Sequence, residues 1–323
     1  MQILSIQLKN VRAIKDATLL LGHVTCFVGK APENIKNLRE ACGFMAAVAT
    51  GREVEWLAQE KLQWDDFLNK QDSEARPEFT VEAELSDSKF VRWHCVYDIE
   101  KHARLEETFQ VLENPALTEG TPVLLAEAEK NKNFQAFQGL LSVFVKPEEH
   151  SYDIFVDPVK RWPFLSRLTI EVDRMDEKAR RGLLNAMQPF FPGIERLGVR
   201  YWKDGDKSFF YVVDGVRIGE RAMANEDRKV MDVMMGCLSE DDVILLRNVD
   251  NCQLEERYPV IAEYLAKAKK QIIVTTQNPA FARRLACACV YEVFREEGGV
   301  LKVLPLESAK AEIQKETNVV SPH

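Results

Sequence analysis

Apolar and polar residues alternate along the first part of the chain in a pattern that predicts β-strands. Residues 3–8 (ILSIQL) alternate like a strand with one buried face, 17–21 (ATLLL) predict a second strand, and 24–28 (VTCFV) a more buried third. After the loop GKAPEN, apolar residues recur at helical spacing over 33–48. The chain therefore opens with strands, a loop and a helix.

The middle of the chain changes from alternating segments to helix-like ones. Residues 78–85 and 90–99 alternate and are joined by SDSK, as in a hairpin, and 107–112 is expected to complete a β-meander. Beyond it, prolines separate stretches of helical spacing at 123–132, 134–144 and 177–188. We interpret residues 115–197 as an inserted helical subdomain.

The last third returns to alternating and buried strands. Residues 198–202 and 208–213 flank the turn sequence KDGDK, 225–238 has the spacing of an amphipathic helix, and 242–246 (DVILL) is a short buried strand. The chain is then expected to finish with a helix at 255–269, a buried strand at 271–276, a short helix after Pro279 and a strand at 290–294.

This order of elements predicts an α/β protein whose central sheet is assembled from both ends of the chain. We expect an N-terminal lobe with a β-meander at 1–114, the helical insertion at 115–197, a C-terminal lobe at 198–306 and a polar tail at 307–323.

Charge and cysteine content narrow the classes of function. Lys and Arg number 43 against 51 Asp and Glu, a formal charge of −8, which argues against a surface coated in basic residues for non-specific nucleic-acid binding. No secretion signal or long apolar run is present, so we expect a soluble cytoplasmic protein without a membrane partner. The seven cysteines lie mostly in apolar runs and lack zinc-like spacing, so we expect no metal site.

Two sets of residues resemble a known family. The opening segment, with Asn10, Val11, Arg12, Ile14 and Asp16 before a buried strand that ends at Gly29, resembles the start of ATPase heads of the SMC, RecF and OLD nuclease type, an ABC class within the AAA-family ATPases. Near the other end, DVILLRNVDN resembles the strand that finishes in Asp-Glu, and QIIVTTQNP resembles the family's "TTHSP" switch strand. The resemblance implies a P-loop NTPase-like mixed sheet with an antiparallel β-meander lobe and an inserted helical subdomain.

The phosphate loop departs from the family pattern. Such a loop needs glycines whose N–H groups surround the β-phosphate, a Lys for the β/γ oxygens and a hydroxyl for Mg²⁺. With Gly29 and Leu38 as anchors, Asn34 stands where the last glycine belongs, Ile35 where the Lys belongs and Lys36 where the hydroxyl belongs, and Pro32 removes an N–H. A degenerate phosphate site would consist of Gly29, Lys30, Asn34, Lys36 and Asn37.

Three further motifs also lack the residues that the family uses to bind metal and phosphate. Arg247 and Asn248 replace the metal-binding Asp and the water-activating Glu, and Asp250, two residues on, does not replace both. Gln277 stands where the resemblance places the γ-phosphate-sensing His. In the segment AMANEDRK, Ala224 and Glu226 stand where a Ser and a Gly would hold the γ-phosphate of a partner subunit's ATP, which a carboxylate repels.

Because four sites depart together while the apolar pattern is retained, the sequence predicts an ATPase-like fold without catalysis. We expect neither catalytic residues nor a cofactor. The resemblance implies a structural or regulatory subunit of a DNA-repair or phage-defence complex, bound to an active ATPase or nuclease subunit or to a second copy of the chain.

Two alternatives remain open. The chain could be an ATP- and Mg²⁺-dependent ATPase that uses Lys30 or Lys36 on phosphate and Asp250 or Glu226 on metal. It could also be a DNA-binding module without catalysis, although the net charge does not support DNA binding. The basic clusters that would serve this role include Lys160-Arg161-Trp162, Arg174 with Lys178, Arg180 and Arg181, and Lys267 with Lys269 and Lys270.

Overall fold

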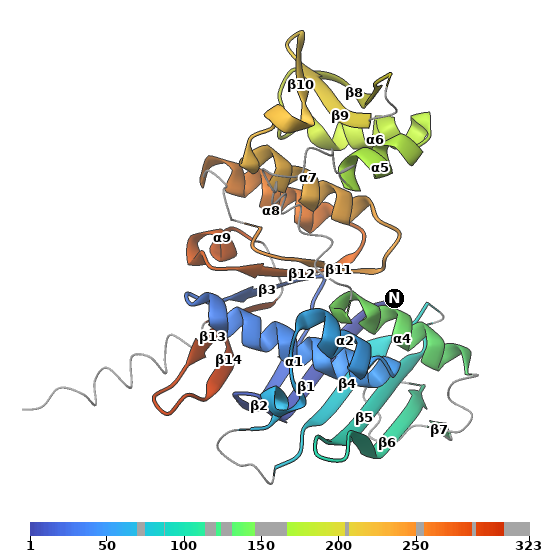
Figure 1. The fold of residues 1–323 in the computed structure, drawn as a ribbon, viewed down its shortest axis with the longest axis vertical. Coiled ribbons are helices and arrows are strands. Elements are labelled where there is room, and N and C mark those ends of the chain that lie inside the picture. Colours follow the sequence, from blue (N-terminus) through green and yellow to red (C-terminus); the bar gives the residue numbers. More distant parts are fainter. Residues whose placement is uncertain are drawn as a thin grey trace, which may run out of the picture. The chain divides into compact units, whose positions relative to one another are not determined.

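The computed structural model of the chain describes residues 1–69, 75–86, 88–113, 121–123, 131–145, 167–203, 207–249, 255–285 and 289–306. The chain forms two compact units (Figure 1). Unit 1 comprises Met1–Pro147, Asp241–Asn248 and Lys269–His323, and unit 2 comprises Glu148–Glu240 and Val249–Ala268.

The first sheet of unit 1 is the antiparallel sheet expected from the alternating segments. Its strand order is β2-β1-β4-β5-β6-β7. Side chains in β4 and β5 are buried at every second position along most of each strand, as the period of two requires. The strands are β1 (Gln2–Val11), β2 (Ile14–Leu20), β4 (Glu78–Glu84), β5 (Phe90–Asp98), β6 (Ala103–Leu112) and β7 (Thr121–Val123).

The second sheet of unit 1 brings the two ends of the chain together. Its order is β11-β12-β3-β13-β14, in which β11, β12, β3 and β13 run parallel and β14 is antiparallel. All residues of β3 and β12 are buried, as is typical of parallel strands covered on both faces. The strands are β3 (Val24–Val28), β11 (Val243–Leu246), β12 (Gln271–Thr276), β13 (Cys289–Arg295) and β14 (Leu301–Pro305).

Helix α1 (Pro32–Thr50) is the centre of the core in unit 1. Its run from Ala41 to Ala49 is buried on every side, and Phe44 stacks on Phe67 with ring centroids 4.2 Å apart. Helices α1, α2 (Glu53–Glu60) and α4 (Lys132–Val145) lie over the six-stranded sheet (Figure 1). The remaining elements of unit 1 are the short helices η1 (Trp64–Phe67) and α9 (Pro279–Arg284). In the described part of the chain no helix is long and apolar enough to span a membrane.

Unit 2 contains a small antiparallel sheet covered by helices. The order β10-β9-β8 places β9 in the middle; α5 packs against β8 and β9, and α6 packs against β8. The Thr169 hydroxyl accepts a hydrogen bond from the Phe209 N–H (2.8 Å) and donates one to Glu220 (2.7 Å). The elements are α5 (Arg167–Arg174), α6 (Glu177–Met187), β8 (Ile194–Tyr201), β9 (Lys207–Val213), β10 (Val216–Gly219), η3 (Glu220–Ala222), α7 (Asn225–Leu238), η4 (Glu255–Arg257) and α8 (Tyr258–Lys267).

The division into units differs from the boundaries expected at 115–197 and 198–306. Helix α4 belongs to unit 1, because Phe134 and Phe137 pack with Phe109 of β6 in its core. Strands β8 to β10 and helix α7 belong to unit 2. The helix expected at 123–132 is wrong at its start, where Val123 pairs with Phe109 as part of β7, and 124–130 lie outside the described residues, as does the tail 307–323.

Candidate functional site

The carboxyl ends of the parallel strands in unit 1 meet at one edge of the sheet. In the strand register Thr276 stands opposite Val28, and Leu246 opposite Val274. The segments that follow these strands therefore begin near one another. This edge collects three of the four segments named in the sequence: the loop after β3, the residues after β11 and the residues after β12.

The loop after β3 is only three residues long, Gly29 to Ala31, because α1 begins at Pro32. The Gly29 N–H donates to the Thr276 carbonyl (3.1 Å), so it is already used in the sheet edge. Ala31 is extended and precedes the helix without a side-chain cap, and the Asn34 N–H donates back to the Ala31 carbonyl (3.0 Å). The Asn34, Ile35 and Lys36 positions are thus already helical.

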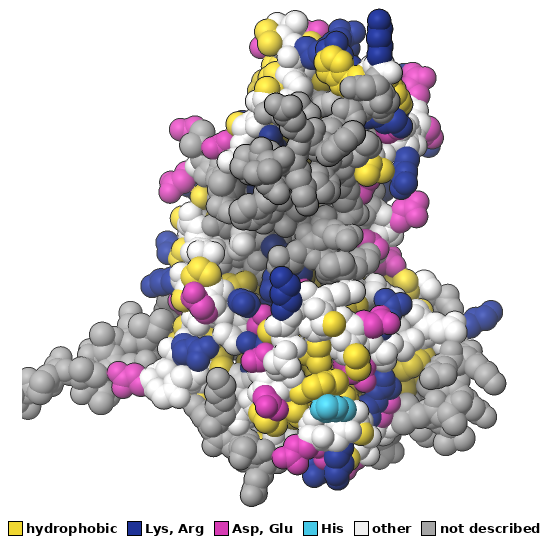
Figure 2. Space-filling view, viewed as in Figure 1, with side chains coloured by type: hydrophobic (Ala, Val, Ile, Leu, Met, Phe, Trp, Pro, Cys, Tyr) yellow, Lys and Arg dark blue, Asp and Glu magenta, His cyan; other side chains and the backbone are white. Residues whose placement is uncertain are grey.

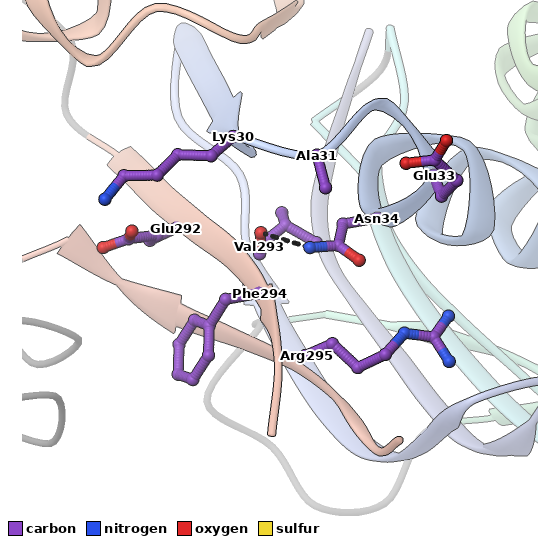
Figure 3. A pocket seen from close by; sticks show the side chains of 8 residues that line it. All are labelled: Lys30, Ala31, Glu33, Asn34, Glu292, Val293, Phe294 and Arg295. Carbon is purple, nitrogen blue, oxygen red and sulfur yellow. Dashed lines mark hydrogen bonds between the residues drawn. The ribbon is translucent and has the colours of Figure 1, made fainter. Parts of the chain in front are cut away.

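Asn34 and Ile35 fill the space beside the loop. Both are buried, at 8% exposure. A Cβ on Gly29 would lie 2.9 Å from Ile35 Cγ1 and 3.1 Å from the Val293 carbonyl oxygen, so Ile35 packs directly on the Gly29 backbone. The Asn34 amide donates to the Val293 carbonyl on β13 at 3.5 Å (Figure 3). An apolar side chain therefore covers the backbone that a phosphate loop leaves open.

Lys36 and Asn37 point to a charged cluster on α1 instead. The Lys36 amine is 3.8 Å from Glu40 Oε1, and the Asn37 side-chain oxygen accepts a hydrogen bond from Arg12 Nε (3.1 Å). Arg12 Nη2 lies 2.9 Å from Glu40 Oε2. Burial raises the pKa of Glu40 above its ordinary value, and the nearby cations Arg12, Lys36 and Arg39 offset only part of this rise. The sequence interpretation missed Glu40, although a carboxylate inside the apolar run of α1 signals a buried partner.

A pocket of about 530 Å³ lies beside the loop, between the start of α1 and β13. Lys30 and Glu292 extend in the same direction at its rim, while Arg295 lies on another side (Figure 3). The four charged side chains that line it are Lys30, Glu33, Glu292 and Arg295, so the positive and negative charges are equal in number. A triphosphate would gain little net attraction here. Glu292 and Arg295 were not identified from the sequence.

The residues after β11 and β12 at this sheet edge carry amide side chains and one cation. Asn248 adopts a left-handed conformation (φ 47°), and its N–H donates to the Thr275 hydroxyl (3.2 Å). Gln277 is exposed after β12, and Asn278 caps α9 by accepting from the Ala280 N–H (2.8 Å). Arg247 is half-buried, and Asp250 lies outside the described residues. No group of three His, Cys, Asp or Glu side chains that could hold a metal occurs among the described residues.

The segment expected to contact a partner's nucleotide forms the start of α7 in unit 2. Ala224 is the N-cap residue and makes no side-chain cap, and Glu226 and Asp227 lie in the first turn. Asp227 accepts a hydrogen bond from the Tyr211 hydroxyl (3.0 Å) and pairs with Arg257 (3.0 Å). Two carboxylates therefore stand at this helix start.

The basic residues considered for DNA binding are in part already engaged. Arg180 donates to the carbonyls of Val172 (3.2 Å) and Asp173 (3.3 Å) near the end of α5, and Arg181 pairs with Glu177 (3.1 Å). The cluster Lys160-Arg161-Trp162 lies outside the described residues.

Comparison with known proteins identifies the architecture. No family model and no curated protein matches the sequence. An SMC head bound to the C-terminal winged-helix domain of ScpA matches with a TM-score of 0.62 at 14% identity, covering 96% of this chain and all of the other. The SMC head domain of Thermotoga maritima matches with a TM-score of 0.58 at 12% identity, covering 95% and 99%. This chain has the fold of an SMC-type ATPase head.

A third SMC-type head, from Pyrococcus furiosus with an extended coiled coil and bound to the C-terminal domain of ScpA, matches with a TM-score of 0.54 at 10% identity over 98% of this chain and 99% of the other. These likenesses confirm the P-loop NTPase-like fold expected from the motifs. Within this fold, the residues after β3, β11 and β12 lie at one sheet edge.

Proposed function

We propose that this protein is a catalytically silent SMC-type head that works as a structural or regulatory subunit through a protein partner. The observation that carries the proposal is the packing of Ile35, in the first turn of α1, on Gly29, the first residue of a three-residue loop. A phosphate loop holds the β-phosphate with a series of free N–H groups. Here Gly29 donates to Thr276, and Pro32 has no N–H to offer.

The electrostatics of the sheet edge support the same proposal. The residues after β11 are Arg247 and Asn248, so neither supplies the carboxylate oxygens that Mg²⁺ prefers. Lys36, the cation nearest the loop on α1, lies beside Glu40. We therefore expect no ATP or Mg²⁺ requirement and no enzymatic turnover.

The partner is proposed from the fold and the relatives. Two of the similar SMC heads are bound to domains of ScpA, so a head of this fold has surfaces for protein association. For this chain we propose an active ATPase or nuclease subunit, or a second copy, as the partner. A cytoplasmic DNA-repair or phage-defence complex is the setting that the family resemblance implies.

Calorimetry with ATP, with and without Mg²⁺, tests the silent site. We expect no heat of binding at millimolar nucleotide, whereas saturable micromolar binding would overturn the proposal. Size-exclusion chromatography with light scattering tests the partner: a complex of defined stoichiometry with a co-purified ATPase or nuclease, or a stable dimer, supports a subunit role. A chain that stays monomeric and acquires no such partner on expression in its host contradicts it.

One observation favours a second candidate, an ATPase with unorthodox residues: the pocket of about 530 Å³ beside Lys30. In this case Lys30→Ala would abolish magnesium-dependent hydrolysis of ATP. Lys267→Ala is the matched control, because Lys267 is an exposed lysine of unit 2 that pairs with Glu263. Equal, background-level phosphate release by all three proteins excludes this candidate.

A further inference from the structure

The two faces of the three-stranded sheet in unit 2 differ: one packs against helices, and the other, called here the open face, carries the half-buried Phe210 and the buried Val212. Phe209 and Tyr211 of β9 are buried, and the Tyr211 hydroxyl donates to Asp227 of α7 on the covered face. The alternate residue, Phe210, is half-buried and points to the opposite face. Because β8 pairs with β9 in register from Arg196 to Tyr201, and β10 from Val216 to Gly219, this face has a defined arrangement of side chains.

Phe210 lies in the middle of this open face between two glycines. Its register partners are Gly198 on β8 and Gly219 on β10. A Cβ on Gly198 would lie 3.3 Å from the Phe210 ring, and one on Gly219 would meet nothing within 4 Å. The ring therefore lies over the sheet, with no side chain at either of its two register partners.

One arginine contacts this ring, and two more lie on the same face. Arg196 and Arg217 both stand opposite Val212, one from each side, and the guanidinium carbon of Arg217 is 4.6 Å from the Phe210 ring centre. The guanidinium carbon of Arg200 is 3.6 Å from the ring centre of Trp202, which is 46% exposed. In Figure 2, dark-blue and yellow side chains appear over the region of β8 to β10, with magenta ones among them. We call Arg196, Arg200, Trp202, Phe210 and Arg217 the arginine–aromatic face.

The charge of this face is opposite to that of the chain. The protein has a net charge of −8, yet none of the open-face positions named here is acidic. Among the described residues, none of the three arginines pairs with a carboxylate. The ion pair of this sheet edge joins Lys207 to Asp173, on the side where α5 packs. In the part of the sheet that the structure describes, the face thus presents three cations and two aromatic rings, and no carboxylate pairs with these cations.

This combination matches the chemistry of a single nucleic-acid strand. Every base has a π-face that stacks on aromatic rings or on guanidinium planes, and every phosphate is an anion that arginine binds with two donors. A duplex keeps its bases stacked inside, so a flat sheet cannot reach their faces. An acidic protein segment would use the arginines but has no planar bases for Trp202 and Phe210.

We propose that the arginine–aromatic face binds single-stranded nucleic acid. Trp202 and Phe210 stack on bases, and Arg196, Arg200 and Arg217 contact phosphates. This site differs from the basic clusters singled out in the sequence, and the proposal does not depend on the silent ATPase site.

Fluorescence anisotropy with a labelled oligo-dT of about 20 nucleotides tests the proposal at two or more salt concentrations. The intact protein should bind the single strand more tightly than a duplex of the same length. Arg200→Ala/Arg217→Ala should weaken binding and lower the salt slope by about 1 to 2. Trp202→Ala should weaken it by about 5- to 100-fold with the salt slope unchanged, and Trp202→Phe should retain most of it.

Lys15→Ala/Lys101→Ala is the matched control, since it removes two exposed cations that belong to unit 1 and to none of the basic clusters considered for nucleic-acid binding. Its binding should equal that of the intact protein, and thermal unfolding should show that all variants fold. The proposal is overturned if this control weakens binding as much as the arginine variant does. It is equally overturned if duplex or poly-glutamate competes as well as the single strand, or if Trp202→Ala has no effect.

Discussion

Ile35 packs on the backbone of Gly29, at the place where a phosphate loop would leave its backbone open. A Cβ added to Gly29 would lie 2.9 Å from Ile35 Cγ1 and 3.0 Å from its Cδ1. Gly29→Ala should therefore destabilise the protein by about 1–3 kcal/mol, because the added methyl overpacks a buried site. Urea unfolding measures this change.

Gly139→Ala is the matched control for this overpacking. Gly139 lies in α4, and a Cβ there would meet nothing within 4 Å, so the substitution should be neutral or stabilising by up to about 1 kcal/mol. The double variant Gly29→Ala/Ile35→Ala should be more stable than the sum of the two single changes predicts, since the new methyl occupies space that Ile35 leaves. Additive effects would contradict the contact.

Grafting the missing phosphate-loop residues should not create an ATP site. Asn34→Gly/Ile35→Lys/Lys36→Thr restores the residue types, but α1 already begins at Pro32 and the loop stays three residues long. Calorimetry should detect no ATP binding, and circular dichroism should establish that the variant is folded. Micromolar binding by the graft would show that the short loop does not prevent ATP binding in this fold.

The fold could largely be predicted because its elements are determined by burial on a regular period. The alternation in β4 and β5 and the fully apolar β3 and β12 each follow from the number of covered faces. The positions of Asn248 and Gln277 at one sheet edge also follow, since parallel strands end on the same side. The pattern of apolar residues in a strand does not determine its register with the neighbouring strands.

The contacts that define the sites depend on long-range register and could not be predicted. Arg196 and Arg217 are far apart in the sequence, and two hairpins bring them to opposite sides of Val212. The pairing of Arg12 with Glu40 likewise joins a strand end to a helix. Each residue alone is typical of a solvated surface, so only the three-dimensional pairing reveals its role.

The Arg12–Glu40 pair should make stability depend on pH. Burial raises the pKa of Glu40, so the folded state favours its protonated form. The resulting contribution to the free energy of unfolding is present at acidic pH and is lost as the pH rises through the raised pKa. Glu40→Gln should remove this dependence, which unfolding curves between about pH 4 and 8 would reveal.

Removing the cation of this pair should make the same dependence on pH steeper, because Arg12 lowers the pKa of Glu40. Arg12→Ala leaves a buried carboxylate without its closest partner and should cost at most about 3–5 kcal/mol at neutral pH. The loss should shrink at acidic pH, where Glu40 becomes neutral. Arg76→Ala is the control, because Arg76 is 53% exposed beside Asp98 and its loss should cost about 0–1 kcal/mol. A pH-independent loss for Arg12→Ala would refute the coupling to Glu40.

Gln271 joins the two sheets of unit 1 through its side chain. Its amide donates to the carbonyls of Ile3 (2.7 Å) and Gly22 (3.2 Å), and its oxygen accepts from the Ile3 N–H (2.8 Å). Gln271→Leu has nearly the same volume but leaves these buried backbone groups unpaired, which should cost about 1–3 kcal/mol.

Gln138→Leu is the control for this link, because the Gln138 amide makes a single hydrogen bond, to the Ala49 carbonyl, in a partly buried position. Gln138→Leu should lower the free energy of unfolding by less than Gln271→Leu does. Hydrogen exchange should locate the difference: in Gln271→Leu, the amide of Ile3 should exchange faster relative to amides in β5, since its acceptor is gone. Unchanged protection of Ile3 would mean that backbone pairing, and not Gln271, holds β1 beside β12.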